Sequence, residues 1–384
     1  MVTLLLAFIY LAFISLGLPD SLLGAAWPIL HGQLEVPISY MGMVTMTISL
    51  STITASLFSE RLTKTFGTWK VTTVSIFLTA VALVGFSTSS RFWMLILWAI
   101  PYGLGGGAID AALNNYVAIH YNSRHMSWLH CFWGVGTIIS PYIMGYCLTN
   151  ATYHTGYQSV AALQAVIGVL LLCSFPLWQT SGKQEQKKKE EKILGIRGVL
   201  QIKGAKWWLF GFLFYCAAES TVMHWASSYL VKARHFPESQ AASLAAMFFM
   251  GMTAGRFLSG FVADRVGDKG MIRLGTGIAA LGTVCLLLPL EISALAIMGL
   301  VLMGLGCAPI YPCIMHATPK VFGEDKTQAI IGIQMGFAYT GSLLLSPLFG
   351  LLAQFAGMGL LPLYFGGAFV LMSLLLERTF KVCK

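Results

Sequence analysis

Long apolar stretches separated by short polar turns recur along the whole chain. Apolar runs of about 18 residues or more are candidates for membrane-spanning helices. The predicted spans cover residues 2–31, 38–60, 70–89, 92–120, 125–149, 157–180, 206–231, 240–263, 270–290, 293–319, 327–352 and 357–380. The pattern therefore predicts an all-α integral membrane protein with twelve transmembrane helices. Because no basic region and no small-residue cleavage site precede Asp20, we expect the first stretch to be retained as a helix.

The placement of the basic residues predicts the topology. Lysine and arginine are concentrated in the cytoplasmic loops of membrane proteins. With both termini placed in the cytoplasm, only Arg91, Lys232 and Arg234 of the 24 Lys and Arg residues fall in outside loops, and Arg256 falls within a predicted helix. We therefore predict a multi-pass protein of the cell membrane, surrounded by lipid, with both termini in the cytoplasm.

The composition agrees with a membrane protein and argues against several other classes. Apolar residues make up 57% of the chain and charged residues 10%, with a mean hydropathy of +0.74, whereas soluble domains carry about 25% charged residues. The net charge of +9 follows from the predicted topology, so we expect no nucleic-acid partner. The sequence contains no recognisable nucleophile–base pair, metal cluster or nucleotide-binding loop, which predicts that the protein is not an enzyme and needs no cofactor beyond a coupling ion.

One long polar segment, Ser181 to Gly198, falls midway along the chain. Runs rich in Lys and Glu of this kind are typical of solvated connectors. We therefore predict an N-terminal six-helix bundle at 1–182, a cytoplasmic linker at 183–204 and a C-terminal six-helix bundle at 205–384.

The two halves share short matches at nearly one offset of about 200 residues, as expected of parallel repeats related by an axis along the membrane normal. The matched pairs are Asp20-Ser21 with Glu219-Ser220, Gly103-Leu104-Gly105 with Gly304-Leu305-Gly306, and Ser140-Pro141 with Ser346-Pro347. All three pairs keep one order along the chain. This agreement predicts two halves of similar structure.

Three acidic residues, Asp20, Asp110 and Glu219, lie within the predicted spans. A charge at the centre of a bilayer costs roughly 3 kcal/mol, so such residues usually face a water-filled cavity and often serve proton or sodium coupling. Pro19, beside Asp20, weakens the backbone ladder and suits a helix that bends during gating. Coupling or substrate binding is one interpretation of Asp20. A protonated carboxyl group bonded to a neighbouring helix is the other.

Asp110, Asn114 and His130 are expected to form one polar cluster. Asp110 and Asn114 are four residues apart and therefore share one helix face. Asn114 and His130 lie equally far from a turn near Asn122, so antiparallel neighbouring helices would hold them at similar depth. A histidine beside a carboxylate suits a proton relay, although a purely structural histidine is the alternative.

Glu219 occupies the repeat position of Asp20, and we expect the two acids to face the same cavity. Arg256 is the one basic residue within a predicted span. A buried arginine without a partner is costly, so the sequence predicts a structural pair between Glu219 and Arg256. Asp264 is the alternative partner of Arg256.

Sugar-binding sites combine flat aromatic faces with amides and acids that bind hydroxyl groups. The candidate substrate-binding residues are Asn114, Asn115, Glu219, His224, Trp225, Tyr311, Gln334, Trp27 and Trp133. For the tryptophans, packing inside the bundle or a place at the membrane interface is the alternative.

The stretch from Gly260 to Lys269, between the eighth and ninth spans, reads GFVADRVGDK. It resembles the signature loop of the major facilitator superfamily, in which a Gly is followed by Asp-Arg, a second Gly and a basic residue. The resemblance implies two six-helix bundles and a gate at which Asp264 pairs with a cation or a helix N-terminus. The candidate gating residues are Gly260, Asp264, Arg265 and Arg256. The corresponding first-half loop, Ser59 to Lys70, lacks the Asp.

Two further stretches are Asp110-Ala111-Ala112-Leu113-Asn114 in the fourth span and the opening of the fifth, His130 to Gly136. They resemble the fucose–proton symporter family, which includes glucose and galactose carriers. The resemblance implies that the acids of spans 1 and 4, here Asp20 and Asp110, handle the proton and contribute to the sugar site. Trp133 departs from the family's Asn, and Asp110 replaces the commoner Glu.

Together these features predict a secondary active transporter that couples a cation, a proton rather than sodium, to the symport of a small hydrophilic solute. A monosaccharide is the preferred substrate, and Asp20, Asp110 and His130 are the predicted proton-coupling residues. We expect a monomer in which two bundles expose a central site alternately to each side. Proton-coupled efflux of drugs or metabolites by antiport is one alternative, and a membrane sensor or scaffold without transport is another.

Overall fold

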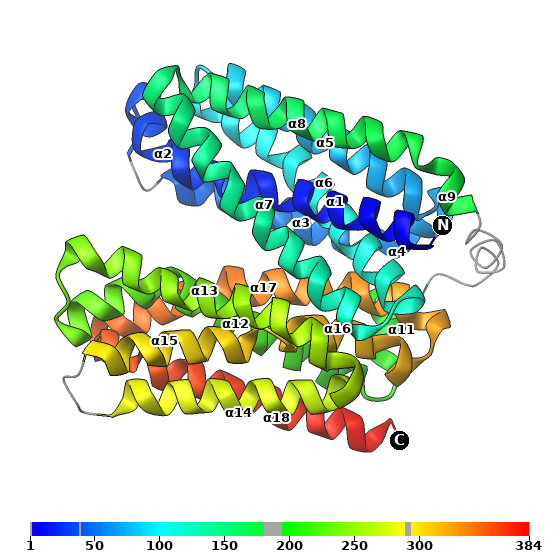
Figure 1. The fold of residues 1–384 in the computed structure, drawn as a ribbon, viewed down its shortest axis with the longest axis vertical. Helices are drawn as coiled ribbons and strands as arrows, with labels where there is room; N and C mark the ends of the chain where they lie inside the picture. Colours follow the sequence, from blue (N-terminus) through cyan, green and yellow to red (C-terminus); the bar gives the residue numbers. More distant parts are fainter. Residues whose placement is uncertain (1, 38–39, 180–193, 289–292, 384) are drawn as a thin grey trace. The chain divides into compact units, whose positions relative to one another are not determined.

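The computed structural model describes residues 2–37, 40–179, 194–288 and 293–383, and the regular structure within these ranges is helical (Figure 1). Two compact units are present. Unit 1 comprises Met1–Tyr116 and Leu129–Gly195, and unit 2 comprises Val117–Trp128 and Ile196–Lys384. The short Val117–Trp128 segment thus packs with the second half of the chain, although it lies in the first half of the sequence.

The helices of the first half are α1 (Val2–Asp20), α2 (Leu22–Gln33), α3 (Met41–Leu57), α4 (Ser59–Phe66), α5 (Thr68–Thr88), α6 (Phe92–His120), α7 (Ser123–Asn150), α8 (Tyr153–Cys173) and α9 (Phe175–Gln179). Those of the second half are α11 (Gly195–Gln201), α12 (Ala205–Arg234), α13 (Glu238–Val266), α14 (Asp268–Leu287), α15 (Ser293–Cys307), α16 (Ile310–Phe322), α17 (Glu324–Ala356), the 3₁₀ turn η2 (Met358–Leu360) and α18 (Leu361–Val382). Within unit 2, α12 packs against α17 and α18, and α15 packs against α13 and α14.

The described helices correspond to the twelve predicted spans. Ten of them are long and apolar enough to cross a membrane, and α3 with α4, which meet at 54°, make an eleventh. The remaining predicted span is α12, a helix of 30 residues whose Glu219, His224 and several aromatic residues make it less apolar. The prediction of an all-α, twelve-helix membrane protein is confirmed.

The first and tenth predicted spans are each broken into two helices at a proline. The first is interrupted between α1 and α2 at Ser21, directly after Pro19 and Asp20. The tenth is interrupted between α15 and α16, where Pro309 precedes the first residue of α16. A proline lacks a backbone N–H and removes one bond from the helix ladder, which explains why the breaks lie at these positions.

Half of the predicted linker lies outside the described residues. Of residues 183–204, those up to 193 are not described, and Gly195–Gln201 form the short helix α11. The buried carboxylate of Glu60 in α4 accepts hydrogen bonds from the backbone N–H groups of Leu194 (3.2 Å) and Gly195 (3.3 Å). The division into bundles at 1–182 and 205–384 therefore stays a prediction.

The repeated Gly-Leu-Gly segments make equivalent contacts in the two halves. A side chain at Gly103 would collide with the Ile48 carbonyl of α3, and one at Gly105 would collide with the Ser75 carbonyl of α5. In the second half, a side chain at Gly304 would collide with the Phe248 carbonyl of α13, and one at Gly306 with the backbone of Ala279 in α14. The small residues thus permit close helix contact at matching places in both halves.

Candidate functional site

Two glycines bring α1 and α7 into close backbone contact. A side-chain carbon at Gly17 would lie 2.1 Å from the carbonyl oxygen of Trp133, and one at Gly136 would lie 2.3 Å from that of Ile14. Any larger residue at either position would push the helices apart. The crossing therefore allows the Trp133 side chain of α7 to reach the end of α1.

The carboxylate of Asp20, the last residue of α1, lies at this crossing. Its Oδ1 accepts a 2.7 Å hydrogen bond from the hydroxyl group of Tyr102 in α6, and its Oδ2 accepts a 2.8 Å bond from the indole Nε1 of Trp133. Asp20 is exposed, whereas Tyr102 is only 7% exposed. The carboxylate is thus held by two aromatic donors at an exposed residue of the helix break.

The break after Asp20 is tied to α7 by a second contact. Pro141 has no backbone N–H, so the carbonyl of Thr137 one turn earlier lacks its helical donor. The hydroxyl group of Ser21 donates a 2.7 Å bond to that carbonyl, and it lies 3.0 Å from the hydroxyl group of Ser140. The proline in α7 therefore creates the acceptor that positions the residue next to Asp20.

Asp110, Asn114 and His130 form a connected hydrogen-bond chain. His130 Nε2 lies 3.1 Å from Asn114 Oδ1, which can only accept, so this nitrogen donates. Asn114 Nδ2 donates to Asp110 Oδ1 at 2.8 Å. All three residues are buried, and the ring of Phe13 packs edge-on against the imidazole at 5.4 Å. The expected cluster is therefore present, and its role in proton coupling stays a prediction.

The Asp20 site and the Asp110 cluster share the same two helices. Tyr102 and Asp110 are eight residues apart on α6, roughly 12 Å along the axis, and Trp133 and His130 are three residues apart on α7, roughly 4.5 Å. In both helices the Asp110 cluster lies closer to the α6–α7 turn than the Asp20 contacts do. An accessible acid is thus followed along the same helix pair by a buried one.

The predicted pair in unit 2 is also present. Arg256 Nη2 of α13 lies 3.3 Å from Glu219 Oε1 of α12, and both residues are buried. The hydroxyl group of Tyr215 lies 3.1 Å from the same carboxylate oxygen and 2.9 Å from the carbonyl of Cys307, where α15 ends. Asp264 instead contacts Arg124, so the structure distinguishes between the two partners considered for Arg256.

Three of the remaining second-half candidates fall into two groups. His224 Nδ1 lies 3.0 Å from Ser346 Oγ, and Trp225 Nε1 donates to the Ser346 carbonyl at 3.0 Å, so both face α17 beside Pro347. Gln334 is fully buried, and its Oε1 accepts bonds from Trp208 and Thr318. The amide of Gln334 is thus engaged in joining α12, α16 and α17.

The other candidates differ in their surroundings. The hydroxyl group of Tyr311 lies 3.3 Å from Met335 Sδ. Trp27 is buried in α2, with its ring centroid 6.2 Å from that of His31. Asn115 is 8% exposed, and its Oδ1 has no hydrogen-bond partner within the described residues. An unsatisfied buried carbonyl of this kind can accept a bond from a ligand hydroxyl group.

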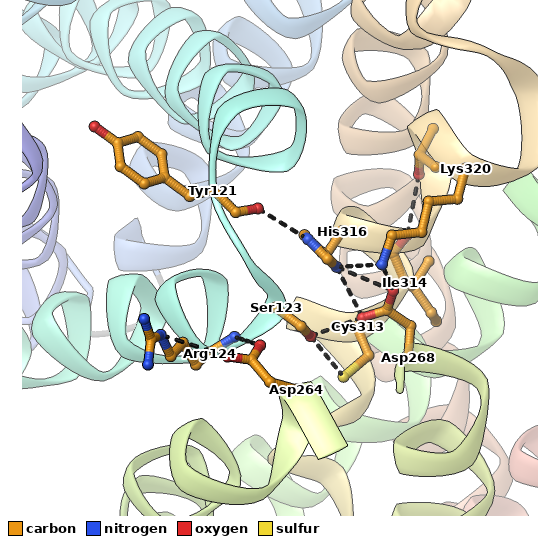
Figure 2. Close-up of polar contacts among 10 residues, drawn as sticks. Tyr121, Ser123, Arg124, Asp264, Asp268, Cys313, Ile314, His316 and Lys320 are labelled. Atoms are coloured by element: carbon orange, nitrogen blue, oxygen red, sulfur yellow. Dashed lines mark hydrogen bonds and ion pairs between the residues drawn. The ribbon is translucent and has the colours of Figure 1, made fainter. Parts of the chain in front are cut away.

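The signature-loop residues contact the Val117–Trp128 segment inside unit 2 (Figure 2). Asp264 Oδ1 accepts a 3.2 Å bond from the backbone N–H of Arg124, in the first turn of α7, and its Oδ2 lies 3.4 Å from Arg124 Nε. Gly260 leaves room for the indole of Trp128, and Arg265 is exposed. The carboxylate thus meets both a cation and a helix N-terminus, the two partners expected for Asp264.

The structure adds contact residues that the sequence analysis did not name. Tyr102, Tyr215 and Arg124 each contact a predicted acid. Tyr102 lies 82 residues from Asp20 and Arg124 lies 140 residues from Asp264, so no local pattern signals either contact. Tyr215 and Glu219 are four residues apart on α12, and their spacing was the available signal.

These features define a polytopic helical membrane protein with polar sites inside its helices. The family model of the Major Facilitator Superfamily matches residues 9–346 and 226–381. The chain belongs to this superfamily of membrane transporters.

Individual relatives are distant. The uncharacterized transporter y4wD of Sinorhizobium fredii is 24% identical over 348 residues, covering 87% of each chain. A crystal structure of FucP, the Escherichia coli fucose:proton symporter, has a TM-score of 0.79 at 14% identity and covers 98% of both chains. The structure of the proton:xylose symporter XylE has a TM-score of 0.76 at 14% identity and covers 97% of this chain and 94% of that one. At such identities the structural likeness establishes the fold alone.

Proposed function

We propose that this protein is a proton-coupled symporter of a small hydrophilic solute, with a monosaccharide as the substrate. The observation that carries the proposal is the carboxylate of Asp20, which is exposed at the break of an otherwise apolar span and bonded through both oxygens. A carboxylate inside a membrane helix is costly unless it serves a cavity or a coupling ion. Asp20 thus combines accessibility with fixed geometry.

Protonation of Asp20 changes its contacts in a defined way. Trp133 Nε1 can only donate, so Oδ2 must remain an acceptor while that bond persists. The hydroxyl group of Tyr102 can either donate or accept, so a proton on Oδ1 can be donated to Tyr102. We therefore assign Oδ1 as the proton-binding oxygen, Tyr102 as the partner that reverses its role and Trp133 as the fixed anchor.

The Asp110 cluster supplies a second proton-binding group on the same helix pair. His130 donates to Asn114, which donates to Asp110, so the buried carboxylate lies at the accepting end of the chain. Proton gain or loss at Asp110 alters the hydrogen bonds that link it through Asn114 to His130 of α7. We propose that Asp20 and Asp110 couple the proton to conformational change.

Two arguments support a sugar as the substrate: the chemistry of the candidate side chains, and the structural similarity to sugar symporters. Indole faces such as that of Trp133 pack against sugar C–H groups, and carboxylates and amides such as those of Asp20 and Asn115 bind hydroxyl groups. FucP and XylE, which share the fold, are sugar:proton symporters by name. The same chemistry suits other small polyhydroxyl solutes, which belong in the test panel.

The test is counterflow and gradient-driven uptake in proteoliposomes with a panel of monosaccharides. We expect exchange of at least one sugar, and accumulation that depends on a proton gradient and not on a sodium gradient. Asp20→Asn and Asp110→Asn should abolish accumulation, whereas Asp325→Asn, an exposed residue paired with Lys326 at the start of α17, should not.

The other outcomes distinguish the alternatives. Retained accumulation in the Asp110→Asn variant would remove Asp110 from the coupling mechanism. Exchange of lipophilic cations without exchange of any sugar would support the efflux antiporter. Absence of exchange for every solute, in protein that unfolds cooperatively, would support the non-transporting sensor or scaffold.

A further inference from the structure

A second polar cluster lies in unit 2, beside the contact between Asp264 and Arg124, and its Ser123, Asp268 and His316 are buried (Figure 2). The carboxylate of Asp268, the first residue of α14, accepts a 2.7 Å bond from the hydroxyl group of Ser123. It also lies 2.9 Å from His316 Nδ1 and 2.9 Å from Lys320 Nζ, both on α16. His316 Nε2 lies 2.9 Å from the backbone carbonyl of Tyr121.

This cluster joins three turns of the chain. Tyr121 and Ser123 belong to the α6–α7 turn, Asp268 lies within the signature loop and begins α14, and α16 leads into the turn before α17. In the topology predicted from the basic residues, all three turns lie on the cytoplasmic side. The cluster thus attaches the α6–α7 turn to α14 and α16 within unit 2.

The contacts of His316 suit a ring that carries two protons. The carbonyl of Tyr121 can only accept, so Nε2 donates to it. Nδ1 lies 2.9 Å from the carboxylate of Asp268 and 3.4 Å from Lys320 Nζ, so an Nδ1–H donates to the carboxylate, whereas a neutral Nδ1 accepts from Lys320. Only the imidazolium form has both N–H groups, and a neutral ring would lose one of the two bonds.

The charged groups around His316 can be named from each element. Asp268 on α14 is the anion that faces Nδ1. Lys320 on α16, whose Nζ lies 3.4 Å from Nδ1, is the neighbouring cation and is itself paired with Asp268. In the α6–α7 turn, Arg124 is occupied by Asp264 of α13. Asp268 therefore balances two cations, and loss of the His316 proton leaves Lys320 as its remaining cationic partner in the cluster.

We propose that Ser123, Asp268, His316 and Lys320 form a proton-responsive latch that holds the α6–α7 turn on α14 and α16. The latch must open when the predicted cytoplasmic side opens, because alternating access moves the two halves of such transporters relative to each other. A proton lost from His316 to the cytoplasm weakens the latch. The proposal does not depend on the identity of the transported solute.

The latch is distinct from the contact between Asp264 and Arg124, although Asp268 also lies in the signature loop. Asp264 binds the backbone N–H and the side chain of Arg124, neither of which changes its proton within the physiological pH range. His316 is a residue type that does. Both contacts hold the α6–α7 turn. The contact between Asp264 and Arg124 is permanently charged, whereas the latch depends on the proton of His316.

A native cysteine provides the readout. Cys313 is fully buried, and its Sγ lies 3.8 Å from Ser123 Oγ beneath the latch. Release of the α6–α7 turn should expose this thiol to maleimide. The labelling rate of Cys313 is measured by mass spectrometry on the full-length protein in detergent, with Cys383, which is partly exposed, as the internal reference and Cys313→Ala to assign the signal.

At pH 6 we expect His316→Phe to raise the labelling rate of Cys313 about tenfold, since a hydrogen bond to a charged group contributes about that factor. Ser123→Ala, a smaller change that removes one bond to Asp268, should raise it severalfold. Lys326→Gln, which breaks an exposed ion pair at the start of α17, should leave it unchanged.

Proton dependence is tested by the ratio of the His316→Phe rate to the wild-type rate, in which the ionisation of the thiol itself cancels. This ratio should fall toward one between pH 6 and pH 8.5 as the wild-type latch opens. A ratio that stays constant would overturn the proton-responsive role. Unchanged labelling in both His316→Phe and Ser123→Ala at pH 6 would overturn the latch itself, whether or not sugar transport is found.

Discussion

Trp133 Nε1 donates a 2.8 Å hydrogen bond to Asp20 Oδ2, joining α7 to the end of α1. The bond exists because Gly17 and Gly136 let the two helices touch at this level. Tyr102 holds the other oxygen from α6. The acid at the break of the first span is therefore oriented by two helices that also carry the buried Asp110 cluster.

Removing either aromatic donor should impair transport while leaving the protein folded. We expect Trp133→Phe and Tyr102→Phe each to lower gradient-driven accumulation about tenfold, because each removes a hydrogen bond to a carboxylate. Trp93→Phe on the exposed face of α6 is the control and should transport normally. Wild-type accumulation in both test variants would show that the orientation of Asp20 does not matter.

The glycine contact can be tested on α7 alone. Gly136→Ala places a carbon 2.3 Å from the Ile14 carbonyl and should lower the free energy of unfolding by about 1–3 kcal/mol through overpacking. Gly145→Ala on the same helix meets nothing within 4 Å and should leave stability unchanged or raise it by up to about 1 kcal/mol. Thermal unfolding in detergent measures both, and equal effects would contradict the close crossing.

The Glu219–Arg256 pair should stabilise the protein only as a pair. Arg256→Gln leaves a buried carboxylate without its cation, a change that typically costs about 3–5 kcal/mol. The double variant Glu219→Gln/Arg256→Gln removes both charges and should recover most of the lost thermal stability. If the double variant is as unstable as the single one, the two residues are not coupled and another interaction holds Arg256.

Adjacent asparagines on α6 should behave differently. Asn114→Leu removes the link between His130 and Asp110 and should lower stability by about 1–3 kcal/mol, because buried partners lose their bonds. Asn115→Leu removes an amide oxygen without a partner in the described part of the chain. It should preserve thermal stability and raise the KM for the transported sugar about tenfold.

The measurements are the melting temperature of each variant and the concentration dependence of sugar exchange. Normal KM with lowered stability for Asn115→Leu would assign that residue to packing and remove it from the substrate site. The same pair of measurements applied to Gln334→Leu separates its observed contacts with Trp208 and Thr318 from its predicted role in binding.

Much of the architecture was predictable because the bilayer restricts sequence directly. A span must be long, apolar and helical, so the succession of apolar runs predicted the helices now observed, and an acid within a run was identifiable at once. Contacts between residues one helical turn apart were equally predictable from the sequence. The spacing of Asp110 and Asn114 follows from helix geometry alone.

The breaks within the first and tenth spans were harder to predict from the sequence. Hydropathy averages over many residues, so it does not register a single bond missing from the helix ladder. Pro19 and Pro309 mark both positions in the sequence, but a proline can bend a helix as well as interrupt it. Whether the helix bends or breaks depends on the contacts and hydrogen bonds that the neighbouring helices make with it.

By itself, therefore, the sequence determined the class of protein, its helices, and which charged residues lie within them. Only the tertiary structure decided the partners of those residues: Tyr102 and Trp133 for Asp20, Arg124 for Asp264, and Asp268 with the Tyr121 carbonyl for His316. The physical reason is that these partners lie on different helices. Which helix faces meet depends on close backbone contacts such as that of Gly17 with Gly136, and hydrophobic periodicity along one helix does not specify them.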